Sequence, residues 1–206
     1  MDRLIAGLDQ ALHTAFGPPP AGQRANPAAA CDTHELEREQ RELAARLMRV
    51  NHAGEVAAQA LYQGQALSAR LPEVREKMQQ AAREENDHLA WTAERIQELG
   101  GHTSRLNPLW YAQSFAIGAL AGVAGDKWSL GFVAETEHQV VQHLDEHLAR
   151  LSPTDDKSRA ILQQMRTDEA QHATVALEAG AATLPALIKR LMGLTSKVMT
   201  HTAFWV

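Results

Sequence analysis

Cysteine is nearly absent from the sequence, because Cys31 is the one thiol among 206 residues. A single thiol excludes a disulfide framework within the chain, and it excludes zinc and iron–sulfur sites built on several cysteines. It also excludes an electron-donating centre of the rubredoxin type in the same chain, since such a centre needs four thiolates. A reducing compartment is therefore the expected environment.

Long apolar runs and an excess of positive charge are also missing. The nearest approach to a membrane span is residues 109–125, which hold Gln113, Ser114 and three glycines and are too short and too mixed to predict one. This segment is either a buried core helix or a helix lying in a membrane interface. Residues 1–16 contain two aspartates and no continuous apolar run, so no signal or transit peptide is predicted. The net charge of -5 predicts no nucleic-acid partner.

Strand signals are lacking too, because no alternating run rich in Val, Ile and Thr occurs. Apolar residues instead recur at helical spacing between Gly and Pro stops. The sequence predicts an amphipathic helix at residues 1–16 and a flexible Pro/Ala-rich linker at residues 17–34. Residues 35–206 are predicted to form one all-α domain, an antiparallel bundle with short joins. Its expected helices are 35–70, 73–99, 107–125, 126–151, 155–180 and 184–203.

Two Glu-x-x-His motifs are the strongest chemical signal: Glu85 with His88, and Glu169 with His172. Residues three apart lie on one helix face, about one turn from each other, so each pair can bind one metal ion. One such motif is weak evidence, since a solvated pair arises easily by chance in a helix. Two motifs in one all-helical chain are much stronger evidence.

A lone glutamate precedes each motif at similar spacing. Glu55 lies 30 residues before Glu85, and Glu137 lies 32 residues before Glu169. Each gap lets a helix turn and return to the same height, so four helices would bring four carboxylates and two imidazoles to one level. This is the ligand set of ferritin-like di-iron proteins, and it suits iron or manganese. The sequence therefore predicts a ferritin-like four-helix bundle with two metal ions.

Two of these positions have local rivals. Glu135 and Glu137 point to opposite sides of one helix, and Glu137 shares its face with apolar residues, so Glu137 is predicted to face inward. His52 competes with Glu55, which is preferred because it completes the repeat.

Three further residues are candidates for orienting the ligand histidines. Asp168 and Glu84 each precede a ligand glutamate, and each can accept a proton from the histidine of the opposite motif: Asp168 from His88, and Glu84 from His172. A solvated surface acid is an equally good interpretation of either residue. His143 is either a similar supporting group or a partly exposed helical histidine.

The stretch NHAGE at residues 51–55, with the two Glu-x-x-His motifs and Glu137, resembles the demethoxyubiquinone hydroxylase family over roughly residues 35–180. The resemblance implies two iron ions per chain and ring hydroxylation of a polyprenyl benzoquinol by O₂ toward ubiquinone, with NADH or the quinol as external reductant. The metal ligands that it implies are Glu55, Glu85, His88, Glu137, Glu169 and His172. His143 matches a histidine that lies behind the ligands in the family. Leu144 follows it where some members have tyrosine, which leaves open any electron-transfer role assigned to that tyrosine.

A polyprenyl substrate requires contact with lipid, and two segments are suited to it. Residues 109–125 are apolar and carry Trp and Tyr at one end, where interfacial aromatics lie. The last helix combines apolar residues with Lys189, Arg190 and Lys197, a basic amphipathic pattern that favours an anionic membrane. The alternative is that both segments complete the core or a dimer interface. We expect additional membrane-facing helices on a peripheral protein at the cytoplasmic face of a bacterial inner membrane. Contacts with other ubiquinone-biosynthesis proteins and a homo-oligomer stay open.

Other functions fit parts of the same pattern. A ferritin-like iron-storage or ferroxidase protein, or a peroxidase of the rubrerythrin or manganese-catalase type, would share the fold and the ligands. The apolar 109–125 segment and the basic last helix argue against a soluble storage shell. A metal-free helical adaptor would have to explain six potential ligands repeated at matched spacing.

Overall fold

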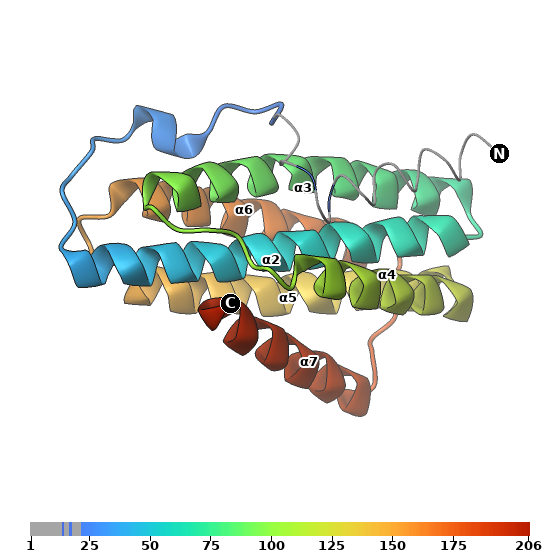
Figure 1. Ribbon diagram of the computed structural model, residues 1–206. Coiled ribbons are helices and arrows are strands. Elements are labelled where there is room, and N and C mark those ends of the chain that lie inside the picture. Colours follow the sequence, from blue (N-terminus) through green and yellow to red (C-terminus); the bar gives the residue numbers. More distant parts are fainter. Residues whose placement is uncertain (1–13, 15–16, 18–21) are drawn as a thin grey trace.

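The computed structural model describes residues 22–206 together with Thr14 and Gly17, and every regular element in this part of the chain is helical. The elements in Figure 1 are the 3-10 helix η1 (Pro27–Ala30) and the α-helices α2 (Arg38–Ser68), α3 (Pro72–Glu98), α4 (Asn107–Ala124), α5 (Asp126–Arg150), α6 (Asp156–Glu178) and α7 (Ala186–Trp205). The predicted all-α bundle is confirmed, and the helix bounds agree with the predicted ones to within one turn. None of these helices is both long enough and apolar enough to cross a bilayer. The helix predicted at residues 1–16 falls outside the described residues, apart from Thr14.

Local chemistry sets where the long helices begin and end. α2 starts with a capping box, in which the Gln40 side chain accepts a hydrogen bond from the backbone N–H of Glu37 at 3.1 Å. Pro72 occupies the first turn of α3, and Gly100 follows its end with a φ of 74°. The Asp155 side chain caps α6 by accepting from Ser158 N at 3.1 Å. Short joins therefore make hairpins of α2 with α3 and of α5 with α6.

The core of the four-helix bundle is divided into two apolar clusters along its length. One cluster takes residues from all four helices, including Met48, Trp91, Leu144 and Met165. The other cluster also takes residues from all four helices, including Tyr62, Met78, Val133 and Ala176. The order of the two clusters reverses between α2 and α3 and again between α5 and α6, as antiparallel neighbours require. Between the clusters each helix places one buried glutamate: Glu55, Glu85, Glu137 and Glu169.

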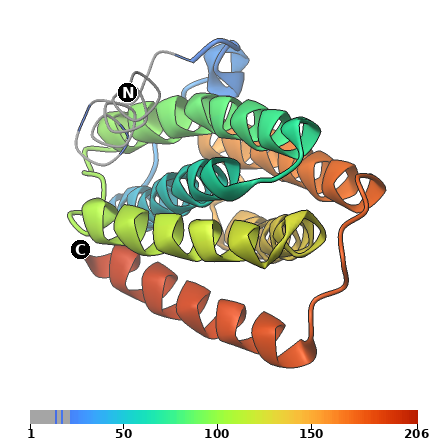
Figure 2. The same ribbon diagram turned by 90° about the vertical axis from the view of Figure 1, so that its right-hand side faces the viewer.

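Helices α4 and α7 lie outside the four-helix bundle, on the side away from α3 and α6 (Figure 2). α4 lies so close against α2 that Gly118 has no room for a side chain. A Cβ added there would overlap the carbonyl oxygen of Leu61. α7 buries only Ala203, and most of its large apolar side chains are exposed. The apolar 109–125 segment is thus partly a packing helix, and its outer face stays open.

Part of the predicted flexible linker is packed onto the bundle. Asn26 caps η1 by accepting from Ala28 N at 2.9 Å, and its amide donates to Glu94 of α3 at 2.6 Å. Ala28 is buried in the first apolar cluster. The composition of residues 17–34 predicts flexibility, whereas the described part, residues 22–34, makes specific contacts. Composition misses this docking because it depends on partners far away in the sequence.

Candidate metal centre

Four glutamates and two histidines meet at one level of the bundle, between the two apolar clusters. They are Glu55, Glu85, Glu137, Glu169, His88 and His172, of which all but the partly exposed His172 are buried. One ligand atom from each of Glu55, Glu85, His88 and Glu169 lies within 4.8 Å of the others, and the same holds for Glu137, Glu169 and His172. Glu169 belongs to both groups. The structure therefore brings together all six residues predicted as ligands.

Both histidines turn the same ring nitrogen toward the carboxylates. His88 Nδ1 lies 3.0 Å from Glu85 Oε2 and 3.1 Å from Glu169 Oε1. His172 Nδ1 lies 3.1 Å from Glu169 Oε2. With a metal ion on Nδ1, Nε2 would be the protonated nitrogen, directed away from the cluster.

Each Nε2 faces a carboxylate from the opposite hairpin. His88 Nε2 lies 2.9 Å from Asp168 Oδ2, and His172 Nε2 lies 2.7 Å from Glu84 Oε2. These are the two pairs expected from the sequence, and neither acid is merely solvated. Burial alone would raise the pKa of Asp168, but hydrogen bonds, first among them that with His88, hold this pKa below its usual value. An ionised carboxylate behind an imidazole fixes both the orientation and the tautomer of the ring.

Electrostatics explain why this cluster needs positive charge. Burial, together with the neighbouring Glu85, raises the pKa of Glu55 well above its usual value. Burial and Glu169 raise the pKa of Glu137 in the same way. Burial opposes a charge on His172, yet its hydrogen bond with Glu169 and the charge of Glu85 raise its pKa to about 10. Four buried carboxylates can stay together only with protons or metal ions among them.

Three carboxylate oxygens indicate whether metal ions fit. The Oε1 atoms of Glu85, Glu137 and Glu169 are buried and accept no hydrogen bond from the described residues, although those of Glu169 and Glu85 lie 3.1 and 3.6 Å from a histidine Nδ1. A buried oxygen without a hydrogen bond, such as Glu137 Oε1, is costly, and metal coordination would satisfy it. Four carboxylates with two imidazoles prefer iron or manganese to a soft metal. The donor set and its geometry therefore fit two such ions.

The structure also decides between the rival residues. His52 is buried against the start of α4, where burial lowers its pKa to about 4, and it belongs to neither group of candidate ligands. Glu55 belongs to the group that also contains Glu85, His88 and Glu169. Glu135 forms an ion pair with Lys189 of α7 at 2.7 Å, so it points away from the bundle axis. Glu137 is the inward residue, as predicted.

His143 lies on α5 against His147, with their ring centroids 3.9 Å apart. Its Nε2 is buried without a hydrogen-bond partner, and burial lowers its pKa. His147 in turn faces Asn51 Oδ1 at 2.9 Å, in the NHAGE stretch. Over residues 22–206, no hydrogen bond or ion pair joins His143 to a candidate ligand, so its supporting role stays a prediction.

Residues 42–203 match the family described as ubiquinone biosynthesis protein COQ7, and this range includes all six candidate ligands. The chain belongs to the COQ7 family. Similar proteins named 3-demethoxyubiquinol 3-hydroxylase match it along its whole length. That of Nitrosococcus oceani is 64% identical over 100% of this chain and 96% of its own length. Those of Nitrosomonas eutropha and Chromobacterium violaceum are 56% and 55% identical over 100% of this chain and 99% and 100% of their own lengths. The resemblance found in the motifs is confirmed.

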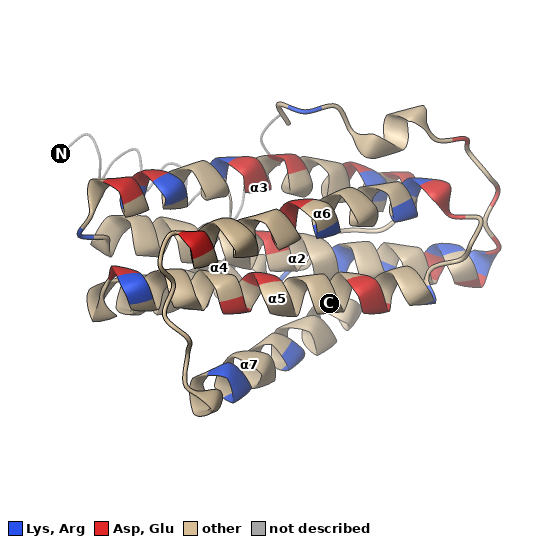
Figure 3. Cartoon of the chain, turned by 180° about the vertical axis from the view of Figure 1, so that it is seen from behind, with Lys and Arg blue, Asp and Glu red and all other residues tan. Residues whose placement is uncertain are grey.

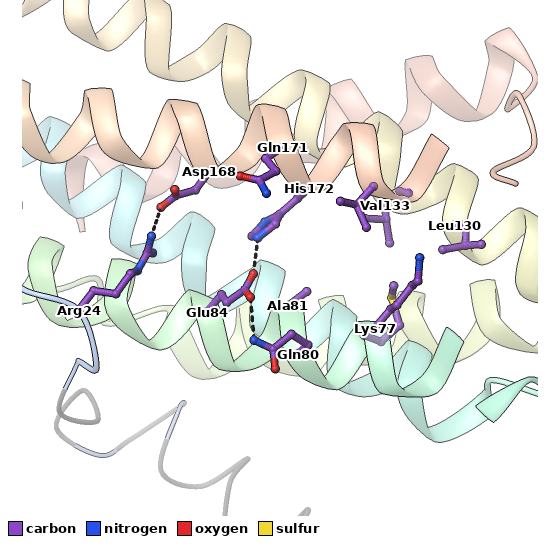
Figure 4. A pocket seen from close by; sticks show the side chains of 13 residues that line it. Arg24, Lys77, Gln80, Ala81, Glu84, Leu130, Val133, Asp168, Gln171 and His172 are labelled. Atoms are coloured by element: carbon purple, nitrogen blue, oxygen red, sulfur yellow. Dashed lines mark hydrogen bonds and ion pairs between the residues drawn. The ribbon is translucent and has the colours of Figure 1, made fainter. Parts of the chain in front are cut away.

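Two residues beside the centre of this COQ7-family chain, Asp87 and Arg24, are not predicted by any pattern in the sequence. Asp87 is buried on α3 and accepts hydrogen bonds from Gln23 N at 2.5 Å and from Arg24 Nε at 2.7 Å. Arg24 Nη1 also lies 2.8 Å from Asp168 Oδ2 (Figure 4). No pattern links these residues, because Arg24 lies in a Pro/Ala-rich segment 63 residues before Asp87 and outside the family match.

A cavity of about 310 Å³ opens between α3 and α6 beside the centre (Figure 4). His172 and Glu84 line it, with Arg24 toward one end and Lys77 toward the other. His88 does not line this cavity. The cavity therefore reaches His172 itself, and it reaches the His88 half only at Asp168 and Arg24.

Proposed function

We propose that this chain is a 3-demethoxyubiquinol 3-hydroxylase, which uses O₂ and two iron ions to hydroxylate the ring of a polyprenyl benzoquinol in ubiquinone biosynthesis. The observation that carries the proposal is the level of four glutamates and two histidines, whose ligand atoms lie within 4.8 Å of one another in two groups that share Glu169. Membership of the COQ7 family and full-length similarity to proteins named for this reaction support it.

The two groups of ligand atoms suggest which residues would hold each iron. One group is Glu55, Glu85 and His88, the other is Glu137 and His172, and Glu169 reaches both. Bound iron would supply the redox chemistry that lets O₂ react with the ring. The protein's part is to keep the ligand layer dry between two apolar clusters and to hold the imidazoles through Asp168 and Glu84. Electrons come from an external reductant, either NADH or the quinol itself.

The hydroxylation itself is the direct test of this proposal. Full-length protein loaded with iron should convert a short-chain demethoxyubiquinol to a ring-hydroxylated product that carries one atom of isotopically labelled O₂, detected by mass spectrometry. An iron-storage protein would instead oxidise many ferrous ions per chain without a quinol product. A peroxidase or manganese catalase would consume peroxide and leave the ring unchanged. Either of those outcomes would contradict the proposal.

The outer faces of α4 and α7 are the proposed contact with the membrane that dissolves the substrate. Exposed apolar side chains on these helices include Leu120, Val123, Leu187, Leu191, Leu194 and Val198. α4 carries no charged residue, and α7 carries Lys and Arg but no Asp or Glu (Figure 3). An apolar face beside basic residues favours an anionic bilayer surface. We therefore place the protein as a peripheral protein on the cytoplasmic face of a bacterial inner membrane.

Vesicle flotation tests the membrane contact. The double variant Leu187→Glu, Leu194→Glu should lose most of its binding to anionic phospholipid vesicles, because each substitution puts a charge into the apolar layer. Leu177→Glu is the control, since Leu177 is exposed on α6, a helix on the side of the bundle away from α7 (Figure 2). Binding should also weaken at high salt, as screening requires. Equal flotation of both variants and the wild type would show that α7 does not contact lipid.

A further inference from the structure

The two halves of the metal centre are built alike but are supported unequally. Asp168, behind His88, has a side chain that is 13% exposed, whereas Glu84, behind His172, is 39% exposed. Asp168 Oδ1 accepts from Gln164 Nε2 at 2.9 Å, and Oδ2 pairs with Arg24 at 2.8 Å as well as with His88. Asp168 is thus held at both oxygens.

Glu84 lacks a comparable cation. Its Oε1 accepts from Gln80 Nε2 at 2.7 Å, and its Oε2 faces His172. No ion pair within residues 22–206 joins Glu84 to Lys or Arg. Glu84 and His172 line the α3–α6 cavity, so water and small solutes can approach them from that side. Asp168 and Arg24 line it too, but His88, whose side chain is 0% exposed, does not.

Arg24 connects the two helices that carry the Glu-x-x-His motifs. Its Nε lies 2.7 Å from Asp87 of α3, and its Nη1 lies 2.8 Å from Asp168 of α6. Its guanidinium also lies over the Trp91 ring, with 4.8 Å from Cζ to the ring centroid. The planar guanidinium fixes the directions of its donors, so these contacts hold α3 and α6 in register at the height of His88. The backbone N–H of Gln23, at 2.5 Å from Asp87, anchors the same segment.

We propose that Arg24 is a positioning residue that makes the two metal positions unequal. It holds Asp168, which holds His88, and its Nη2 lies 3.4 Å from His88 Nε2 itself, so the metal at the His88 position is retained, while the metal at the His172 position exchanges more readily. This inference rests on the proposed metal centre. A metal ion leaves when its ligands turn away from it. His88 can turn only by leaving an Asp168 that Arg24 and Gln164 hold in place, whereas His172 adjoins a cavity and an exposed acid.

Release of iron to a chelator tests this inequality. Full-length protein is loaded anaerobically with ferrous iron, and the ferrous chelator ferrozine is added while the absorbance of its complex is followed. The wild type should release iron in a fast and a slow phase. Arg24→Gln should speed the slow phase about 10-fold, the lower end of the range for residues that support a ligand histidine, and leave the fast phase unchanged. Arg24→Lys keeps the positive charge but lacks the planar guanidinium with its several donors. Its slow phase should therefore be faster than that of the wild type and slower than that of Arg24→Gln.

Two matched variants assign the phases. Glu84→Gln should speed only the fast phase, because it acts on His172. Asn26→Ala removes the hydrogen bond of the same N-terminal segment to Glu94 without touching Asp168, and it should leave both phases as in the wild type. Circular dichroism checks that each variant is folded.

Several results would overturn the inference. One is that Arg24→Gln releases iron at the same rates as the wild type. Another is that Arg24→Gln and Asn26→Ala both accelerate the two phases equally, which would indicate that these substitutions loosen the whole protein. If the wild type releases two irons in a single phase, the two metal positions are equal, and this inference fails while the proposed metal centre stands. A wild type that binds no iron would refute the proposed metal centre and this inference with it.

Discussion

Replacement of Glu169 by alanine should lower the iron content of anaerobically loaded protein from about two ions per chain to one or none. Glu169 is the one residue that belongs to both groups of candidate ligands. Its Oε1 lies 3.1 Å from His88 Nδ1, and its Oε2 lies 3.1 Å from His172 Nδ1. Removal of this carboxylate takes a donor from both metal positions and leaves two imidazoles without a shared anion. Iron per chain, measured after gel filtration, reports the result.

Two companion variants make the Glu169 result decisive. Glu169→Gln keeps the shape of the side chain but lacks the charge, so it separates loss of the ligand from loss of packing. Glu135→Ala removes a glutamate that pairs with Lys189 outside the cluster, and its iron content should equal that of the wild type. Two irons retained in both Glu169 variants would contradict the assignment of this residue as a shared ligand. Almost no iron in folded wild-type protein would contradict the metal centre as a whole.

The stability of the metal-free protein should fall as the pH rises from about 6.5 toward 10. The pKa of folded His172 is raised from 6.5 to about 10, so its contribution is complete below pH 6.5 and is lost as the pH rises toward 10. Glu55 and Glu137, whose pKa values are raised well above 4.5, also bind more protons in the folded state and act in the same direction. Glu169, whose pKa is lowered, contributes fully above pH 4.5 and stays constant in this window. Stability falls with pH wherever the native state binds more protons.

Urea unfolding at pH 7 and pH 9 measures this loss. Between these pH values the raised pKa of His172 alone should cost the metal-free protein about 3 kcal/mol, because one proton over one pH unit corresponds to about 1.4 kcal/mol, and the raised pKa values of Glu55 and Glu137 add to this loss. His172→Gln should show a smaller loss. Protein loaded anaerobically with ferrous iron should not show it, because metal ions replace the protons among the carboxylates. A metal-free protein whose stability is the same at both pH values would contradict a cluster held together by protons.

The sequence by itself determined most of the fold and the composition of the centre. Helix ends depend on residues within one turn, such as Pro72 and Gly100, and such local signals are readable without a structure. The ligands were predictable because a helix turns at a fixed rate, so the repeated spacing of Glu55, Glu85, Glu137 and Glu169 fixes one common height. The pairing of Asp168 with His88 was one of two equally good interpretations of the sequence, and only the structure shows the contact.

Only the tertiary structure decided which further residues contact the centre and which helix faces remain exposed. Arg24 meets Asp87 across 63 residues of chain, and the described part of the proposed linker docks through η1, although its composition predicts flexibility. The outer faces of α4 and α7 likewise depend on which side of each helix the bundle covers. Such contacts join surfaces that exist only after the helices have packed, and no periodic pattern in the sequence encodes them. The sequence therefore determined which residues form the layer of glutamates and histidines, and packing determined that the two halves of this layer differ in their supporting contacts.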